Sequence, residues 1–461
     1  MRYQVPVEVP SSGNPWIDGL TDGYRWGTEP GDQEVGYTFI SDTRTRPKGK
    51  FAGYPSWGWS DTERDLMEQA LRTISDVCAI EFIDRGDDTG DDSADEDGVE
   101  IWFYNMDRKQ SGNTYGFAYS PGSDSDEGLV AVNWSVYQNN DGSYKESIDP
   151  GSFYGITYLH ELSHAVGLKH PHDRGLLEQP RFPGLKRTSD EFKNSGDFGQ
   201  NAHPWTQLSY VDKGADNGLV PDRIEAYGFL KTPGPLDIAT LQWMYGINNE
   251  TASGNNVYRL PTRNQEGTGW QSIWDTGGVD RIDGSRARSP VTIDLRNAEL
   301  DLSENAGGHP SRVEGIFGGF TIAHDWNGRR LDQSAGLCVI ENATGGKSDD
   351  LLIGNDANNV LRGRTGNDIL YAGGGRSNRS FGGRGRDQFW IDANPGSFVK
   401  IRDFSKSKDL LVFDVESDEV LMKRRKGNTD IRIGQNLVAR VFGVTGLSTE
   451  LHLDFSSFDG L

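Results

Sequence analysis

The clearest periodic pattern in the first half of the chain lies between Asp61 and Val77. Apolar side chains recur there at Leu66, Ala70, Leu71 and Ile74, a spacing that places them on one face of an amphipathic helix. Ser60 precedes the segment and predicts an N-cap. With Arg64 rather than Glu at the fourth position, we expect a cap without a full capping box.

Two more helices and several strands follow from the same kind of pattern. A second helix is expected from Ser152 to Val166, and a third from Pro235 to Tyr245, with a proline in its first turn and Gly246 as its stop. Short apolar runs predict strands at Tyr37–Ile40, Ala79–Ile83, Val99–Tyr104 and Leu129–Trp134.

The character of the sequence changes after the third helix. Residues 171–233 show no regular period, and a long irregular segment of this kind is usually functional. Beyond Gly246 the chain alternates short strand patterns with Gly-Asp turns. We therefore expect a boundary near 246–258, with an α+β domain in residues 1–246 and an all-β domain in residues 247–461.

Composition excludes some classes of protein. The chain carries 47 Lys and Arg against 69 Asp and Glu, a net charge of -22, which argues against nucleic-acid binding. Carboxylates in such excess fit a protein that binds cations. No run of about 18 apolar residues exists, so we expect no membrane insertion. Cys78 and Cys338 are expected to be two unpaired thiols.

Three segments leave alternatives or are assigned weakly. The acidic stretch 84–98 fits either a calcium loop or a solvated hairpin loop, and the second is favoured because the spacing is not that of an EF-hand. The basic stretch 423–427 is expected to be an exposed hairpin turn. The N-terminus has no continuous apolar stretch of a secretory signal, so the protein either stays inside or leaves without such a signal.

The strongest chemical signal is HELSHAVGLKH at 160–170. His160 and His164 share one face of a helix, from which two imidazoles reach one Zn²⁺. Glu161 is placed to take a proton from water activated by the metal. Gly167 permits the helix to end, so that His170 returns as a third ligand and one position stays open for water.

A bare HExxH also occurs by chance, as two surface histidines on a helix. The extended form makes a zinc site the better interpretation, because three of only eight histidines fall at the required positions.

Residues 345–390 contain a nine-residue repeat, GGKSDDLLI, GNDANNVLR, GRTGNDILY, GGGRSNRSF and GGRGRDQFW, with one extra residue before the fourth copy. This GGxGxDxUx pattern predicts a parallel β-roll, with Leu352, Leu361 and Leu370 pointing inward. The expected calcium ligands are Asp350, Asp368 and Asp387, together with backbone carbonyls of turn glycines such as Gly346, Gly363 and Gly366. Asn359 and Asn378 replace the aspartate in alternate copies, so we expect fewer calcium ions than a perfect array holds.

These motifs resemble those of the metzincins, and of the serralysin family in particular. HELSHAVGLKHP is similar to the family's zinc motif, and TQLSYVD at 206–212 is similar to its Met-turn, with Leu208 in the place of methionine. The resemblance implies a zincin-like α+β catalytic domain followed by a parallel β-roll and β-sandwich. It implies that Tyr210 ligates zinc at rest and swings away to stabilise the oxyanion. The gap between His170 and this turn is longer than is usual for the family, which indicates a surface insertion around 176–203.

The resemblance extends to further sites. WDTGGVDRIDGS matches a family calcium site with Asp275, Gly277, Gly278 and Asp280, and VIENATGG matches one with Glu341. Residues 116–122 and 129–134 resemble the edge strand that binds extended peptides, although an ordinary edge strand has the same pattern. The family leaves the cell through a type I channel by an uncleaved C-terminal signal, and the tail LHLDFSSFDGL is compatible with that.

The sequence therefore predicts a secreted, extracellular, monomeric zinc endopeptidase stabilised by calcium, acting on protein and peptide substrates. The alternative is a secreted calcium-dependent binding or surface protein whose zinc domain works poorly, for which Leu208 is the support. The near-isosteric Leu and Met usually exchange at a cost under about 1.5 kcal/mol, so we expect zinc to be retained.

Overall fold

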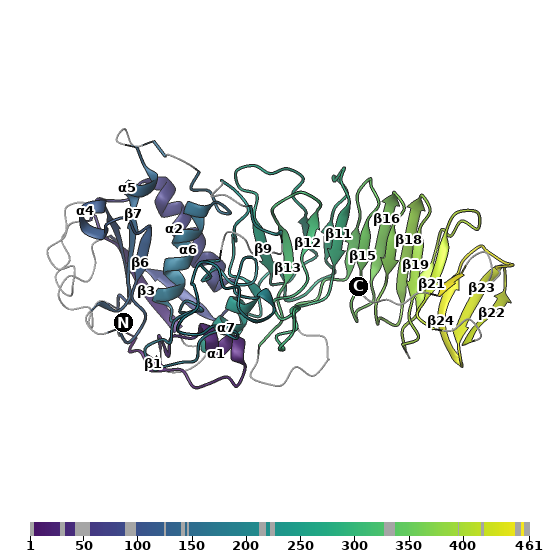
Figure 1. Cartoon of the computed structure of the whole chain (residues 1–461), viewed down its shortest axis with the longest axis horizontal. Coiled ribbons are helices and arrows are strands. Elements are labelled where there is room, and N and C mark those ends of the chain that lie inside the picture. Colours follow the sequence, from purple (N-terminus) through teal and green to yellow (C-terminus); the bar gives the residue numbers. More distant parts are fainter. Residues whose placement is uncertain are drawn as a thin grey trace.

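A computed structural model describes residues 4–27, 33–41, 56–87, 98–123, 126–139, 143–144, 147–211, 218–221, 226–326, 337–394, 396–415, 419–447 and 453–455. The molecule is elongated (Figure 1), with helices and a small sheet at one end and a stack of strands at the other. Most of the predicted acidic loop at 84–98, namely residues 88–97, and most of the C-terminal tail lie outside the described residues.

The helices of the described chain lie mainly in its first half. They are α1 (Pro15–Leu20), α2 (Asp61–Ser75), α4 (Arg108–Ser111), α5 (Trp134–Tyr137), α6 (Phe153–Ala165), the 3₁₀ turn η2 (Asp197–Gly199) and α7 (Pro235–Tyr245). The three longest of these confirm the predicted helices, with ends that differ by at most two residues.

The prediction for the start of α2 was wrong in one respect. Ser60 is the N-cap, but Glu63 occupies the N3 position and completes a capping box, since its Oε2 accepts from the Ser60 backbone N–H at 2.9 Å. The N3 residue is the third residue after the cap, so the partner is Glu63 and not Arg64.

A five-stranded sheet with the order β4-β3-β5-β7-β6 forms the centre of this end of the molecule. Its strands are β3 (Gln33–Phe39), β4 (Ile80–Asp84), β5 (Ile101–Met106), β6 (Gly116–Ala118) and β7 (Leu129–Asn133). All neighbours are parallel except β6, which is antiparallel to β7 and lies at the edge. Strands β1 (Val7–Glu8) and β2 (Tyr24–Arg25) form a separate pair.

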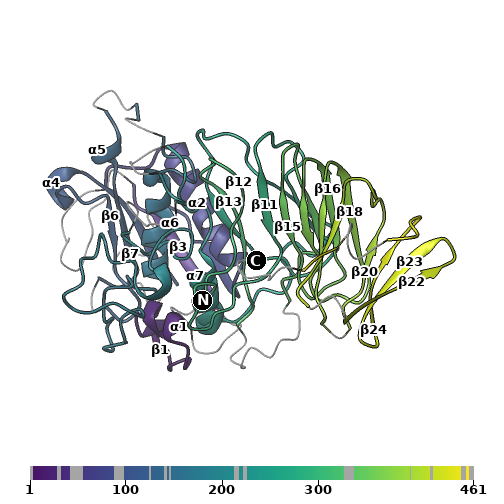
Figure 2. The ribbon, with the colours of Figure 1, turned by 45° about the vertical axis from the view of Figure 1, so that its right-hand side comes forward.

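Helices α2 and α6 lie side by side against this sheet (Figure 2), and α6 also packs against β6 and β7. The predicted apolar face of α2 is buried, with Met67 and Ile74 fully inaccessible. Helix α7 packs against α1. One apolar cluster runs through the helices, the sheet and the first strands beyond residue 256, so α6 has a firm support on its buried side.

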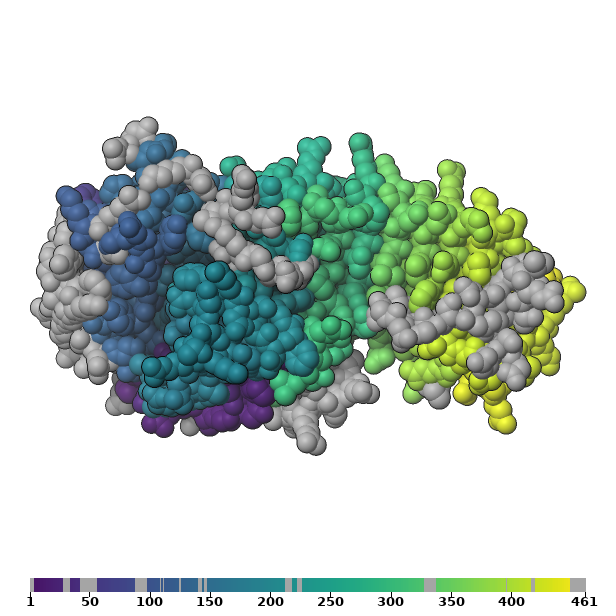
Figure 3. All heavy atoms as spheres, viewed as in Figure 1, coloured from purple at the N-terminus to yellow at the C-terminus, as the bar shows by residue number. Residues whose placement is uncertain are grey.

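The segment after α6 is irregular, as predicted. Apart from η2 and an isolated bridge, the described residues between 171 and 233 form no helix or strand. In Figure 3 its first part stands out as a blue-green lobe on the viewed face. Within the segment, the turn at 206–209 bonds to α6 through Ser163 and to α7 through Asp237.

Two nine-stranded sheets form the other end of the molecule. The first roll sheet contains β8 (Val257–Arg259), β10 (Arg281–Asp283), β14 (Asn342–Thr344), β16 (Val360–Thr365), β18 (Asn378–Arg384), β20 (Val399–Ile401), β24 (Asn436–Val441), β23 (Asn428–Ile433) and β22 (Val420–Arg425). The second roll sheet contains β9 (Trp270–Ile273), β13 (Gly319–Ile322), β12 (Ser311–Val313), β11 (Val291–Asp294), β15 (Leu351–Ile353), β17 (Ile369–Tyr371), β19 (Gln388–Ile391), β21 (Leu410–Phe413) and β25 (Leu453–Phe455).

The predicted nine-residue repeat sets the register of the roll. Asn342 pairs with Val360 in the first roll sheet and Leu351 with Ile369 in the second, so strands two repeats apart are parallel neighbours. Each repeat contributes one strand, alternately to one sheet and the other. Leu352, Leu361 and Leu370 are buried between the sheets as expected.

Other predictions concern single features. Lys426 and Gly427, both with positive φ, form the tip of the antiparallel β22–β23 hairpin, which confirms the predicted turn. Cys78 and Cys338 are free and buried. Among the described residues, no helix is long and apolar enough to cross a membrane.

Candidate metal centre

Helix α6 and the turn that follows it bring three histidines together. Ser152 caps the helix by accepting from the Gly155 backbone N–H at 2.8 Å. The helix ends at Ala165, and Gly167 takes a φ of 97°. A Cβ at Gly167 would lie 2.2 Å from the Tyr24 carbonyl oxygen, so only glycine fits this reversal. The chain then runs back alongside the helix and presents His170.

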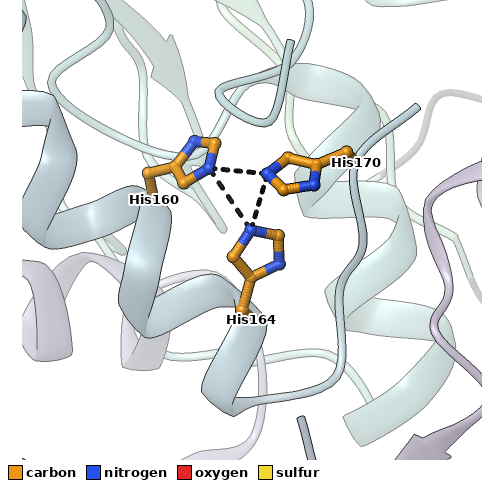
Figure 4. Close-up of side chains that lie close together, drawn as sticks. All are labelled: His160, His164 and His170. Atoms are coloured by element: carbon orange, nitrogen blue, oxygen red, sulfur yellow. Dashed lines mark hydrogen bonds between the residues drawn. The ribbon is translucent and has the colours of Figure 1, made fainter. Parts of the chain in front are cut away.

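The Nε2 atoms of the three rings form a small triangle (Figure 4). His160 Nε2 lies 3.1 Å from His170 Nε2 and 3.3 Å from His164 Nε2, and the third side measures 3.0 Å. Three ligands at tetrahedral angles around Zn²⁺, with Zn–N near 2.0–2.1 Å, would have their nitrogens about 3.3 Å apart. The triangle therefore has the size of one face of a zinc tetrahedron.

The other ring nitrogens fix the tautomers. His160 Nδ1 lies 2.9 Å from the Gln207 carbonyl oxygen, and His164 Nδ1 lies 2.8 Å from that of Leu168. His170 Nδ1 lies 2.9 Å from Asp173 Oδ2. These oxygens only accept, so each Nδ1 carries the hydrogen and each neutral ring keeps its lone pair on Nε2.

Three lone pairs that converge without a hydrogen between them repel one another unless a cation lies among them. Burial, and then the neighbouring histidines, lower the pKa of His160 well below its usual range, and the same causes lower the pKa of His164 to about 3. Protonation of His160 or His164 therefore does not relieve the repulsion. The donor set fits a zinc ion, and the oxygens behind it are the partners that orient histidine ligands.

Glu161 lies on α6 next to the first histidine and is 6% exposed. Burial raises the pKa of its carboxyl to about 8. Gly116, the first residue of edge strand β6, makes room for this side chain, because a Cβ there would lie 2.8 Å from Glu161 Oε1. The carboxyl thus lies between α6 and the edge strand β6.

Tyr210 lies beside the histidines, as the resemblance implied. Its ring centroid is 4.6 Å from that of His170 and 5.8 Å from that of His160, with which it is stacked. Burial, and then the charge of Glu161, raise the pKa of Tyr210, so its hydroxyl keeps its proton. The phenol is thus a hydrogen-bond donor at the edge of the triangle.

Leu208 is fully buried in the turn beneath the histidines. The carbonyl of the preceding residue, Gln207, is the one that orients His160. Asp237, in the first turn of α7, holds this turn: it accepts from Thr206 Oγ1 at 2.6 Å and from the Gln207 N–H at 2.8 Å. The apolar side chain of Leu208 therefore fills the position of the methionine. The hydrogen bonds from Asp237 that hold the turn do not involve this side chain.

Sequence reasoning missed three residues of this site. Asp173 could have been found, because a carboxylate three residues after a metal-ligating histidine is a common orienting partner. Asp237 carries no such signal. Phe192 comes from the predicted 176–203 insertion, and its ring stacks on Tyr210 at 5.5 Å although its side chain is 55% exposed.

The predicted calcium residues fall into two groups. Near the start of the roll, Asp280 N–H donates to Glu341 Oε2 at 2.7 Å, and Asp275 Oδ1 accepts from the Gly277 N–H at 3.1 Å. Gly278, with φ of 130°, follows in the same turn. Asp280 is fully buried, and its Oδ2 has no hydrogen-bond partner.

The second group lies within the repeats. Asp350, Asp368 and Asp387 each immediately precede a strand of the second roll sheet, and Asp409, which the repeat pattern missed, precedes the next. Gly363 lies against Asp368, where a Cβ would be 2.2 Å from Oδ2. Gly346 N–H donates to Asp350, and Gly366 has a φ of 132°.

The family that matches this chain and its relatives in sequence agree with each other. Residues 236–426 match the family described as peptidase M10 serralysin C terminal. A serralysin of Photorhabdus laumondii is 26% identical over 74% of this chain and 63% of its own length. The metallopeptidase AprA of Pseudomonas marginalis is 29% identical over 74% of this chain and 65% of its own. Serralysin C of Dickeya chrysanthemi is 29% identical over 69% of this chain and 58% of its own.

This chain spans less than two thirds of the length of these relatives. A solved structure of the lipase LipA from Serratia marcescens covers 44% of this chain at 17% identity, with a TM-score of 0.17, too low to bear on the fold. The large parallel β-sheet content agrees with the C-terminal part of the relatives. The chain is thus similar to the serralysin-type metalloproteases, and its residues 236–426 match the C-terminal family of these proteins.

Proposed function

We propose that this protein is a secreted zinc endopeptidase of the metzincin type, with its catalytic domain in residues 1–246 and a calcium-binding roll in residues 247–461. The observation that carries the proposal is the triangle of three Nε2 lone pairs. His160, His164 and His170 would hold the zinc, with Tyr210 beside them.

The residues around the triangle have the chemistry of peptide hydrolysis. A bound zinc ion acidifies water and polarises a carbonyl group. Glu161 accepts the proton of the attacking water and passes it to the leaving amine, which a buried carboxyl with a pKa near neutrality does efficiently. Tyr210, protonated and adjacent, donates a hydrogen bond to the carbonyl oxygen as that oxygen gains negative charge.

A protein substrate would lie along strand β6. This strand is antiparallel to β7 on one side and is the last strand of the sheet formed by the described residues, the position at which an extended peptide can add as a further strand. Because Gly116 of β6 lies against Glu161, a peptide paired with this edge passes the carboxyl. The names of the relatives describe proteases, which agrees with a protein substrate.

The remaining parts of the proposal rest on the resemblance of the sequence to the serralysins and on the roll. The protein would act as a monomer outside the cell, leave through a type I channel, and fold where calcium is abundant. Asp275, Gly277, Gly278, Asp280 and Glu341 would supply one calcium site and the repeats others, because hard carboxylate and carbonyl oxygens are the ligands calcium prefers.

Casein hydrolysis by purified protein tests the activity. We expect one zinc ion per chain, hydrolysis that 1,10-phenanthroline abolishes and zinc restores, and a loss of about 10²–10⁴-fold in rate for Glu161→Gln. The exposed Glu250→Gln is the control and should keep full activity.

The outcomes separate the two functions that the sequence allows. A protein that binds zinc yet shows no hydrolysis, or the same hydrolysis in Glu161→Gln, would contradict the enzyme and favour a calcium-dependent binding protein. Leu208→Met distinguishes a weakened enzyme from a protein without activity. It introduces the methionine of the family's Met-turn, so casein hydrolysis should increase only if the chain is an enzyme.

A further inference from the structure

Within the nine-residue repeats, the strands of the two roll sheets begin with side chains of different charge. On the second roll sheet, the Asp350 N–H donates to Asp368 Oδ1 at 2.9 Å, and that of Asp368 to Asp387 Oδ1 at 3.1 Å. The Asp387 N–H continues the series to Asp409 Oδ1 at 3.1 Å. We call these four residues the aspartate edge.

The same ladder occurs on the first roll sheet without the charge. The Asn359 N–H donates to Asn378 Oδ1 at 2.8 Å, and we call these two residues the asparagine edge. The side chains also occupy equivalent places: a Cβ at Gly354 would lie 2.4 Å from Asn359 Oδ1, as a Cβ at Gly363 would lie 2.2 Å from Asp368 Oδ2. The two edges therefore share this arrangement and differ in chemistry: each asparagine carries an amide NH₂ group where each aspartate carries a second oxygen.

On the aspartate edge that second atom is unpaired. Asp368 and Asp387 are 0% and 1% exposed, yet the Oδ2 of each has no hydrogen-bond partner among the described residues. Burial, and then nearby carboxylates, raise the pKa of Asp368 to about 7 and that of Asp387 to about 6. A buried carboxylate oxygen without a partner is satisfied by a proton or by a cation, and calcium prefers hard oxygen ligands of this kind.

Asp350 is better satisfied than its two neighbours on this edge. Its Oδ2 accepts from the Gly346 N–H and its Oδ1 from the Val291 N–H. The Arg364 guanidinium lies 3.4 Å from the Gly346 carbonyl oxygen and adds positive charge there. The carboxylate oxygens left without a hydrogen bond on this edge are thus those of Asp368 and Asp387.

On the asparagine edge the second atom is a donor, and it is satisfied. Asn378 Nδ2 donates to the Gly375 carbonyl oxygen at 2.8 Å, and more weakly to that of Gly373 at 3.4 Å. Asn359 Nδ2 donates to the Glu341 carbonyl oxygen at 3.0 Å and to Asn355 Oδ1 at 2.9 Å. Carbonyl oxygens of turns are what a calcium ion would bind, and here amide hydrogens already bind them.

We propose that the roll binds calcium asymmetrically, on the aspartate edge at Asp368 and Asp387, while two side-chain amides take the place of a cation between Asn359 and Asn378. The proposal rests on the calcium part of the proposed function and not on proteolysis. It implies that the asparagine edge stays closed when calcium is removed, and that loss of calcium opens the roll from the opposite edge.

Exchange of the two residue types tests this directly. Bound calcium is counted by metal analysis and titration calorimetry on the full-length, zinc-loaded protein, and the melting temperature is measured with and without calcium. Asp368→Asn should lose at least one bound calcium and melt higher than the unaltered protein in calcium-free buffer. The double variant Asn359→Asp/Asn378→Asp should gain at least one calcium and melt lower in that buffer. The exposed Asn436→Asp should change neither quantity.

Each outcome supports or overturns the proposal. An unchanged calcium count in Asp368→Asn overturns the proposal, and so does a calcium count that falls in Asn359→Ala. Asn359→Ala also tests the asparagine edge if the double variant does not fold. An unaltered protein that binds no calcium overturns this inference together with the calcium role. Loss of casein hydrolysis with the expected calcium counts would overturn only the enzyme.

Discussion

At the scale of single residues, the candidate metal centre depends on where each imidazole places its hydrogen. Two backbone carbonyls and one carboxylate accept from the three Nδ1 atoms, which leaves all three Nε2 lone pairs directed at one point. Of the three acceptors, only Asp173 is a side chain and can be altered without moving the backbone. It therefore offers a test of the orienting role.

Asp173→Asn should lower zinc affinity about 10–100-fold, because an amide is a weaker acceptor and can present its NH₂ group to His170. Competition with a chromogenic chelator measures the affinity without reference to activity. The exposed Asp301→Asn is the matched control and should bind zinc normally. Equal affinities of the two variants would show that Asp173 does not position the histidine.

At the scale of elements, the site is assembled from three pieces that are distant in sequence. Helix α6 supplies two histidines and Glu161, the reversal at Gly167 supplies the third histidine, and the turn at 206–209 closes the site from below. The turn is held by Asp237 at the start of α7, whose Oδ2 also accepts from the Gly234 N–H at 2.8 Å. Burial raises the pKa of Asp237 to about 7, yet three donors surround its carboxyl.

Asp237→Ala should destabilise the protein by about 1–3 kcal/mol, since it leaves buried hydrogen-bond donors without an acceptor. It should also weaken zinc binding, because the freed turn carries the carbonyl that orients His160. Thr240→Val in the same helix is the control: it removes a buried hydroxyl that donates to the Leu236 carbonyl at 2.9 Å, a bond that stays within the helix. If both variants lose stability and neither loses zinc affinity, Asp237 supports the fold alone.

At the scale of the whole molecule, the roll contains several buried carboxylates that repel one another when they are ionised. Burial is the first cause that raises the pKa values of Asp280, Asp350 and Asp387 to about 6 and that of Asp368 to about 7. Without calcium, the folded state therefore binds more protons than the unfolded state between about pH 4 and pH 7. Unfolding becomes easier as pH rises through this window, since ionisation costs more in the folded chain.

The melting temperature without calcium should accordingly fall between pH 4.5 and pH 7.5. With saturating calcium the fall should be smaller or absent, because the ion stabilises the ionised carboxylates. Scanning calorimetry on protein stripped of calcium and resupplied with zinc measures both curves. A melting temperature that rises with pH in calcium-free buffer would show that these carboxylates are not the groups that control stability.

Much of the arrangement could be predicted from local patterns. The spacing of Leu66, Ala70, Leu71 and Ile74 predicted α2, and the nine-residue repeat predicted both the parallel register and the inward leucines. The capping partner of Ser60 was misassigned by one position, a matter of counting and not of physics. The histidine spacing predicted which side chains meet, because four residues on a helix and a glycine reversal leave little freedom.

The amino-acid sequence by itself determined the elements, the repeat register and the identities of the three histidines, because each depends on residues close together in the chain. Tertiary structure alone decided that Asp237 holds the turn under the site, that Phe192 covers Tyr210, and that the amides of Asn359 and Asn378 satisfy the carbonyls around them. These contacts join residues whose sequence separation carries no period. Whether a buried polar atom finds a partner depends on the packing of the whole chain, and no local pattern records it.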